Sequence, residues 1–146
     1  MVNKEFLSRK VTLIQGELSH LKKYQGLTFD EVAGSYEKLA TVERALERII
    51  NRAIDINNHL VSELSTIKTV TPLKYADIFK ALVDFGIYPS DFADEILKSV
   101  GTRNLLVHEY DLVDTKRVYT SIDDALRDYN SYCSYLLDYL DKPPIK

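Results

Sequence analysis

A long repeat of apolar residues constrains the fold of this chain more than any other feature. Apolar side chains recur at steps of three and four from Val32 to Leu64, which is the spacing of one face of an α-helix. A helix of this length suits a helical bundle or a dimer interface. We expect it over about residues 29–65, with a kink near Gly34 and Ser35. Its apolar positions are Val32, Tyr36, Leu39, Val42, Leu46, Ile49, Ala53, Ile56, Leu60 and Leu64.

The segment before this repeat predicts another amphipathic helix. Apolar residues from Leu7 to Leu21 recur at steps of four and three, which indicates a helix over about residues 4–24. A capping box from Thr28 to Glu31 then opens the long repeat.

Three helices are expected after the repeat. The first covers residues 75–86. The second starts from an N-cap at Ser90 and carries Arg103 and Asn104 at its C-terminal end. The third covers residues 121–142 and follows a loop over 111–120. Together these patterns predict an all-α fold, an antiparallel bundle of four to five helices.

Composition bounds the class of protein. A chain of 146 residues is long enough for one core, so we expect a single domain over 1–146. No apolar run approaches the roughly 20 residues that span a bilayer, and the first residues mix charges unlike a signal peptide. The one cysteine, Cys133, cannot form an internal disulfide, which fits a reducing compartment. We therefore expect a cytoplasmic protein with no membrane partner.

The net charge limits the kind of nucleic-acid surface that the chain can offer. It is −3, whereas a broad nucleic-acid surface is normally basic. If RNA is bound, the positive field must be local, and a symmetric dimer could bring two copies of Arg103 together. The net negative charge is therefore the main objection within the sequence to any function that acts on nucleic acid.

One ten-residue segment, from Gly101 to Tyr110, concentrates the groups that could carry chemistry. Arg103 offers a planar fork of donors that can hold a phosphate, and His108 can move a proton near neutral pH. The segment indicates phosphoryl chemistry rather than a metal site or an acyl-transfer triad. His20, His59 and His108 are too scattered to form a metal cluster, so we expect neither a metal nor a cofactor.

The spacing of these two groups raises a geometric difficulty. On an ideal helix, five residues place Arg103 and His108 roughly 140° apart and about 7.5 Å along the axis. Both can face one pocket only if the helix ends or distorts between them, or if a second copy completes the pocket. The alternative is that both are ordinary groups near a helix C-terminus, where cations suit the macrodipole.

Several other polar and aromatic groups allow two interpretations. The patch Asn57-Asn58-His59 is either hydrogen-bonded or solvent-facing within the bundle, or it lines a nucleotide pocket.

Four tyrosines at helical spacing in the last helix can stack on bases, but we favour core and interface packing. We also expect Cys133 to be buried, and Asp123-Asp124 to be charge at a helix N-terminus. The tyrosines are Tyr129, Tyr132, Tyr135 and Tyr139.

The segment Arg103-Asn104-(three residues)-His108-Glu109-Tyr110 resembles the R-(four to six residues)-H motif of HEPN domains. The tyrosine two places after the histidine is similar to that of the HepT branch, the toxin half of a bacterial toxin–antitoxin pair. Residues 47–59 resemble the long second helix of that branch, and the resemblance covers most of the chain. It implies a HEPN-like helical fold.

The resemblance also implies an activity and partners. It implies a metal-independent endoribonuclease in which Arg103, His108 and Asn104 are catalytic. It implies a minimal nucleotidyltransferase antitoxin that attaches AMP to Tyr110 and silences the toxin. Because the predicted apolar faces look too long for a monomer, we expect a homodimer with twofold symmetry. Two alternatives stay open: a non-catalytic nucleotide- or substrate-binding partner of a nucleotidyltransferase, and a structural dimerisation bundle without a site.

Overall fold

The computed structural model describes residues 1–65, 74–108 and 114–142, and for residues 107 and 108 it describes the backbone only. Within these ranges the chain forms helices and no strands. The short helices α2 and α5 each precede a longer helix, and taking each pair together leaves five, so the predicted all-α bundle is confirmed. The helices are α1 (Lys4–Lys22), α2 (Phe29–Ala33), α3 (Tyr36–Leu64), α4 (Tyr75–Asp84), α5 (Ser90–Ile96), α6 (Lys98–His108) and α7 (Thr115–Asp141).

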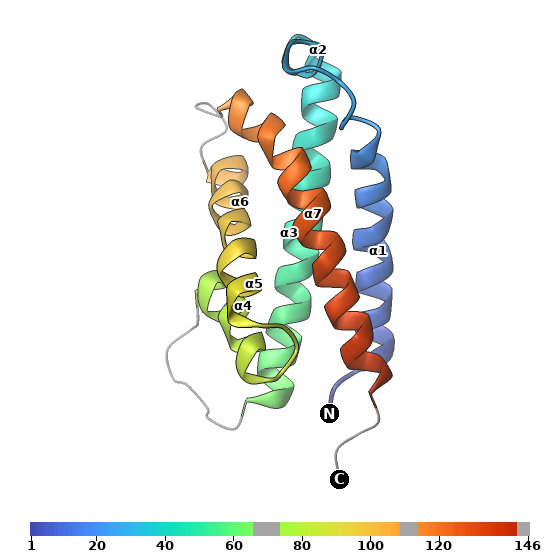
Figure 1. Ribbon diagram of the computed structural model, residues 1–146, viewed down its shortest axis with the longest axis vertical. Coiled ribbons are helices and arrows are strands. Elements are labelled where there is room, and N and C mark those ends of the chain that lie inside the picture. The colour runs from blue at the N-terminus through green and yellow to red at the C-terminus, as the bar shows by residue number, and fades with distance from the viewer. Residues whose placement is uncertain (66–73, 109–113, 143–146) are drawn as a thin grey trace.

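The three long helices form the body of the bundle. Figure 1 shows α1, α3 and α7 side by side, with α4, α5 and α6 together along one side of α3 and α7. α1 and α6 run in one direction, and α3 and α7 run in the other. The start of α1 and the end of α7 lie at one end of the bundle, and the last turn of α6 lies at the other.

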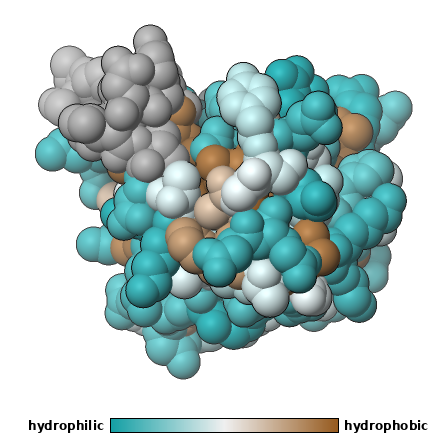
Figure 2. All heavy atoms as spheres, turned by 90° about the horizontal axis from the view of Figure 1, so that it is seen from above, coloured by the Kyte–Doolittle hydropathy of each residue, from teal (hydrophilic) through white to brown (hydrophobic). Residues whose placement is uncertain are grey.

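The predicted apolar faces are buried inside one chain, except at Tyr36, which is 88% exposed, so the assignment of that residue to the apolar face is wrong. The α1 residues Leu7, Val11, Ile14 and Leu21 are 0% exposed because this face packs on α3 and α7. Among the described residues, the large hydrophobic side chains that remain exposed are Met1, Leu13, Tyr36 and Leu137. Figure 2, which looks onto the end that carries α2, shows small hydrophobic areas among hydrophilic residues. The length of the apolar faces therefore no longer supports a dimer, and any second copy must be argued on other grounds.

The break before α3 is complete where a kink was predicted. Gly34 ends α2, and a Cβ added there would lie 2.6 Å from the carbonyl oxygen of Asp30. Ser35 then caps α3, its hydroxyl accepting the N–H of Lys38 at 3.2 Å. Thr28 caps α2 in the same way through the N–H of Glu31, as predicted.

The start of α7 differs most from the sequence prediction. The helix begins at Thr115, so the predicted loop is wrong from that residue on, while residues 111–113 lie outside the described residues. Asp114 caps the helix, and its carboxylate accepts the N–H groups of Lys116 and Arg117 at 3.0 and 3.3 Å. Asp123 and Asp124 consequently lie inside the helix, and their assignment to a helix N-terminus is wrong.

The aromatic face of α7 forms part of the core. Tyr129 and Tyr132 are 0% exposed, which confirms packing rather than base stacking for these two residues. The Tyr132 hydroxyl donates to Asn57 Oδ1 at 2.6 Å, whereas Asn57 Nδ2 is buried without a partner in the described residues. His59 Nε2 accepts the N–H of Asn3 at 3.0 Å. The polar patch on α3 is thus bonded within the bundle at these two positions.

Cys133 is expected to resist thiol reagents in the folded protein. It is 2% exposed, and burial raises the pKa of its thiol to about 12. At pH 8 only about one thiol in ten thousand is then a thiolate, the form that reacts. Labelling with an aromatic disulfide reagent at pH 8 should be negligible in buffer and stoichiometric in denaturant. Rapid labelling of the native protein would contradict this burial.

Candidate functional site

Arg103 is held between two other helices. It is half-buried in the middle of α6, and its Nε donates to Oδ1 of Asn51 on α3 at 3.1 Å. The guanidinium carbon lies 4.9 Å from the ring centroid of Tyr75, the first residue of α4. A cation over an aromatic face is attracted by the quadrupole of the ring. Asn51 and Tyr75 therefore fix the orientation of the Arg103 fork.

This arrangement leaves donors for an anion. Asn51 occupies the Nε–H of Arg103, and the four N–H groups on the two terminal nitrogens have no hydrogen bond within the described residues. No carboxylate in the described ranges forms an ion pair with Arg103. A positioned arginine with free terminal donors can bind a phosphate in a bidentate manner.

Asn104 and position 108 lie on another side of the same helix. α6 is continuous from Lys98 to His108, so Arg103 and Asn104 are in its middle rather than at its C-terminal end as predicted. The side chain of Asn104 is exposed. The backbone places position 108 four residues further, about 40° from Asn104 and roughly 140° from Arg103 around the axis. The side chain of His108 and all of Tyr110 lie outside the described residues.

The unbroken helix bears on the geometric difficulty raised above. α6 does not end between Arg103 and His108, and both positions have α-helical backbone. One of the two solutions, a helix end between the two residues, is therefore removed. The other solution is a second copy of the chain that brings its own α6 to the same substrate.

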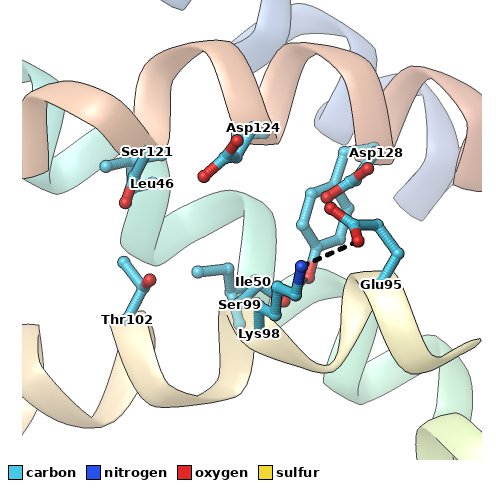
Figure 3. A pocket seen from close by; sticks show the side chains of 11 residues that line it. Leu46, Ile50, Glu95, Lys98, Ser99, Thr102, Ser121, Asp124 and Asp128 are labelled. Atoms are coloured by element: carbon cyan, nitrogen blue, oxygen red, sulfur yellow. Dashed lines mark hydrogen bonds and ion pairs between the residues drawn. The ribbon is translucent and has the colours of Figure 1, made fainter. Parts of the chain in front are cut away.

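A small cavity with both polar and apolar lining residues lies where α6 meets α7. Figure 3 shows Thr102 on α6 and Ser121 on α7 facing each other across it, with Lys98 and Asp124 nearby. Its volume is about 40 Å³, which accommodates water but is far below the roughly 300 Å³ of a typical ligand site. The cavity in this form does not accept a nucleotide.

The charges around this cavity are largely compensated. Glu95 pairs with Lys98 at 2.9 Å and with Arg127 at 2.8 Å, and the hydrogen bond from Lys98 lowers the pKa of the Glu95 carboxyl. Arg127 also contacts Asp124 and Asp128. Burial raises the pKa of Asp128 despite that contact. These ion pairs join α5 to α7 and so hold α5, the short helix that directly precedes α6, in place.

Sequence reasoning missed the two residues that hold Arg103. Asn51 falls in a polar stretch of the long repeat, and its type and spacing do not distinguish it from its neighbours. Tyr75 follows a linker, and its position there indicates only that it is the first apolar residue of a helix. The separation of 52 positions between Arg103 and Asn51 left no local signal.

The bundle has the fold of HEPN toxins. One similar structure is the tri-AMPylated Shewanella oneidensis HEPN toxin in complex with MNT antitoxin, with a TM-score of 0.78, 20% identity, and coverage of 91% of this chain and 97% of that chain. Another is the Bacillus subtilis cytosolic protein of unknown function YutE, with a TM-score of 0.82, 19% identity, and coverage of 99% and 96%. At these identities the likeness concerns the fold alone.

The chain belongs to the HepT-like family. The family model described as Ribonuclease HepT-like matches residues 14–136. The tRNA nuclease HepT of Aphanizomenon flos-aquae (strain 2012/KM1/D3) is 36% identical over 137 residues, which span 92% of this chain and 89% of that protein. The resemblance seen in the sequence is thereby confirmed. None of the helices in the described ranges is long and apolar enough to cross a membrane.

Proposed function

We propose that this chain is a HepT-like toxin, a metal-independent endoribonuclease that acts on tRNA as one HEPN domain over 1–146. The observation that carries the proposal is the fixed Arg103, held by Asn51 and Tyr75 five residues before His108 on one helix. Family membership and the 36% identity to a tRNA nuclease support the choice of substrate.

The proposed reaction is an internal transesterification. The ribose 2′-hydroxyl attacks the adjacent phosphorus, and the bond to the 5′-oxygen of the next nucleotide breaks. His108 takes the 2′-proton as a base or gives one to the leaving oxygen as an acid, and water carries the other proton. Arg103 stabilises the charge on the phosphorane-like transition state, and Asn104 orients the histidine or the phosphate. The products are a 2′,3′-cyclic phosphate and a 5′-hydroxyl.

We infer that two copies of the chain form the working site. Arg103 and position 108 lie about 140° apart on one continuous helix, so one α6 presents them to different sides. A twofold axis beside α6 would bring Arg103 of one copy near His108 of the other. Equal mixing of an Arg103→Ala chain and a His108→Ala chain should restore partial cleavage, which a monomeric site cannot do.

The direct test of the activity is tRNA cleavage by the purified chain in excess chelator. We expect cut tRNA with 2′,3′-cyclic phosphate and 5′-hydroxyl ends. These ends are identified by testing which end-modifying enzymes act on the fragments and which do not. Intact tRNA after prolonged incubation, or cleavage that requires added metal, would refute the proposed function.

We further propose that a minimal nucleotidyltransferase antitoxin AMPylates Tyr110. A phenol two residues from His108 is close to the proposed site, and each attached AMP adds negative charge and bulk where RNA would bind. Mass spectrometry of the chain co-expressed with its partner should show added AMP on the peptide that carries Tyr110. A Tyr110→Phe chain should lack the added mass, and an unmodified Tyr110 in the natural chain would refute the proposal.

Asn51→Ala should lower cleavage without unfolding the protein. Loss of the Nε contact frees the Arg103 fork, and a misplaced catalytic group costs about ten- to a hundredfold in rate. Asn58→Ala, an exposed change on the same helix, is the matched control and should cleave normally. Equal activity of both variants would show that Asn51 does not position Arg103.

The competing function is a non-catalytic nucleotide- or substrate-binding partner of a nucleotidyltransferase, which the net charge of −3 favours. Expression of the chain alone distinguishes the two. Growth arrest that is relieved by Arg103→Ala supports the toxin, whereas unaffected growth supports the binding module.

A further inference from the structure

Arg117, in the first turn of α7, reaches across to the motif helix α6. Its guanidinium lies against Gly101, where an added Cβ would be only 2.8 Å from Nη2. A side chain at position 101 would therefore displace the guanidinium from the surface of α6. Glycine at this position allows a cation from another helix to lie on the helix that carries Arg103.

The guanidinium of Arg117 is available for a ligand. Within the described residues it forms neither an ion pair nor a side-chain hydrogen bond, and the side chain is exposed. The carboxylate of Asp114 accepts backbone N–H groups at the start of α7, including that of Arg117 itself. Arg127 on the same helix differs, because it is surrounded by three carboxylates.

Arg117 lies on the His108 side of α6. A step of three residues places Asn104 about 60° from Gly101 around the helix axis, and a step of seven places position 108 about 20° away. Gly101, Asn104 and position 108 thus share one side, and Gly101 precedes position 108 by about 10.5 Å along the axis. Two turns of helix separate Gly101, against which the guanidinium lies, from the backbone of position 108.

We propose that Arg117 binds a phosphate of the RNA strand next to the phosphate that is cleaved. The inference rests on the proposed ribonuclease function and adds a substrate-binding residue to it. Because the guanidinium lies two helical turns from the backbone of position 108, we assign it to a phosphate other than the one that is cleaved. Its planar fork suits a phosphate oxygen pair. Arg117 consequently contributes to RNA affinity and strand placement, and not to the chemical step.

Binding of labelled tRNA to chains that carry His108→Ala, and so leave the RNA uncut, tests the inference. Adding Arg117→Gln should raise Kd about tenfold, the effect of one charge-assisted contact. The slope of log affinity against log salt should become shallower by about 0.7 to 0.9, the value for one phosphate contact. Arg117→Lys keeps the charge and should restore most of that slope.

Arg9→Gln is the matched control. Arg9 is an exposed residue of α1, a helix that Figure 1 shows on the opposite side of the bundle from α6, and its replacement makes the same change in net charge. The control should leave both Kd and the salt slope unchanged. In chains that retain His108, Arg117→Gln should raise KM while kcat stays within about twofold.

The outcomes separate this inference from the proposed function. Normal tRNA binding by Arg117→Gln, or an equal loss in Arg117→Gln and Arg9→Gln, overturns the role of Arg117 and leaves the nuclease intact. A fall in kcat at unchanged KM also overturns it. Absence of tRNA binding by the His108→Ala parent and of cleavage by the natural chain overturns the proposed function, and this inference with it.

Discussion

Replacing His108 by Ala is expected to reduce tRNA cleavage about a thousandfold, the scale of losing a positioned general acid–base group. The proposed transesterification needs one proton removed from the 2′-hydroxyl and one delivered to the leaving oxygen. No other histidine lies on α6, so no neighbouring imidazole on that helix can replace it. Single-turnover cleavage of labelled tRNA, followed by gel electrophoresis over several hours, measures a change of this size.

Two further variants make this result specific. His20→Ala removes an exposed histidine of α1 and should cleave like the natural chain. Arg103→Ala should lose about a hundred- to a thousandfold, because stabilisation of the transition-state charge is lost. Circular dichroism must show the same helicity for all three variants. Undiminished cleavage by His108→Ala would refute the assignment of the proton carrier.

The largest expected effect on stability belongs to Tyr132. Tyr132→Ala should reduce the free energy of unfolding by about 3–5 kcal/mol, the usual cost of removing a large buried aromatic ring. The ring is 0% exposed and lies against Phe79 of α4, with centroids 6.4 Å apart. The variant therefore weakens the contact that holds α4, and with it Tyr75, against the bundle. Unfolding in urea, monitored by circular dichroism, gives the free energy of unfolding.

Tyr132→Phe separates packing from hydrogen bonding at this position. It keeps the ring and removes the donor to Asn57 Oδ1, and so leaves both polar atoms of that side chain without a partner among the described residues. The expected loss is about 1–3 kcal/mol, the cost of an unpaired buried polar group. A neutral Tyr132→Phe variant would show that water satisfies Asn57 or that the amide reorients.

The helical architecture could be predicted from the sequence because its signals are local and repeated. The apolar steps along α1 and α3 follow directly from the 3.6-residue period, and Thr28 and Gly34 mark helix ends by their chemistry. The start of α7 was missed because Asp114 is a cap without a strong apolar repeat behind it. The sequence instead predicts a start at residue 121, where the apolar repeat of Ile122, Leu126 and Tyr129 begins.

The arrangement around Arg103 could not be derived in the same way. The motif identifies the arginine, but its orientation depends on Asn51 and Tyr75, which come from two other helices. Contacts between side chains from distant segments depend on how the helices pack, and no spacing rule within one helix reports them. The same holds for Arg117, whose proximity to Gly101 is visible only once α6 and α7 are placed.

The directions of the helices decide where a fusion can be attached without covering the proposed site. The start of α1 and the end of α7 share one end of the bundle, and the last turn of α6, which ends at position 108, lies at the other. α3, which spans much of that distance, has 29 residues and is about 43 Å long. A purification tag or fluorescent protein fused before α1 or after α7 would therefore stay clear of incoming tRNA, so tagged chains suit both binding and growth assays.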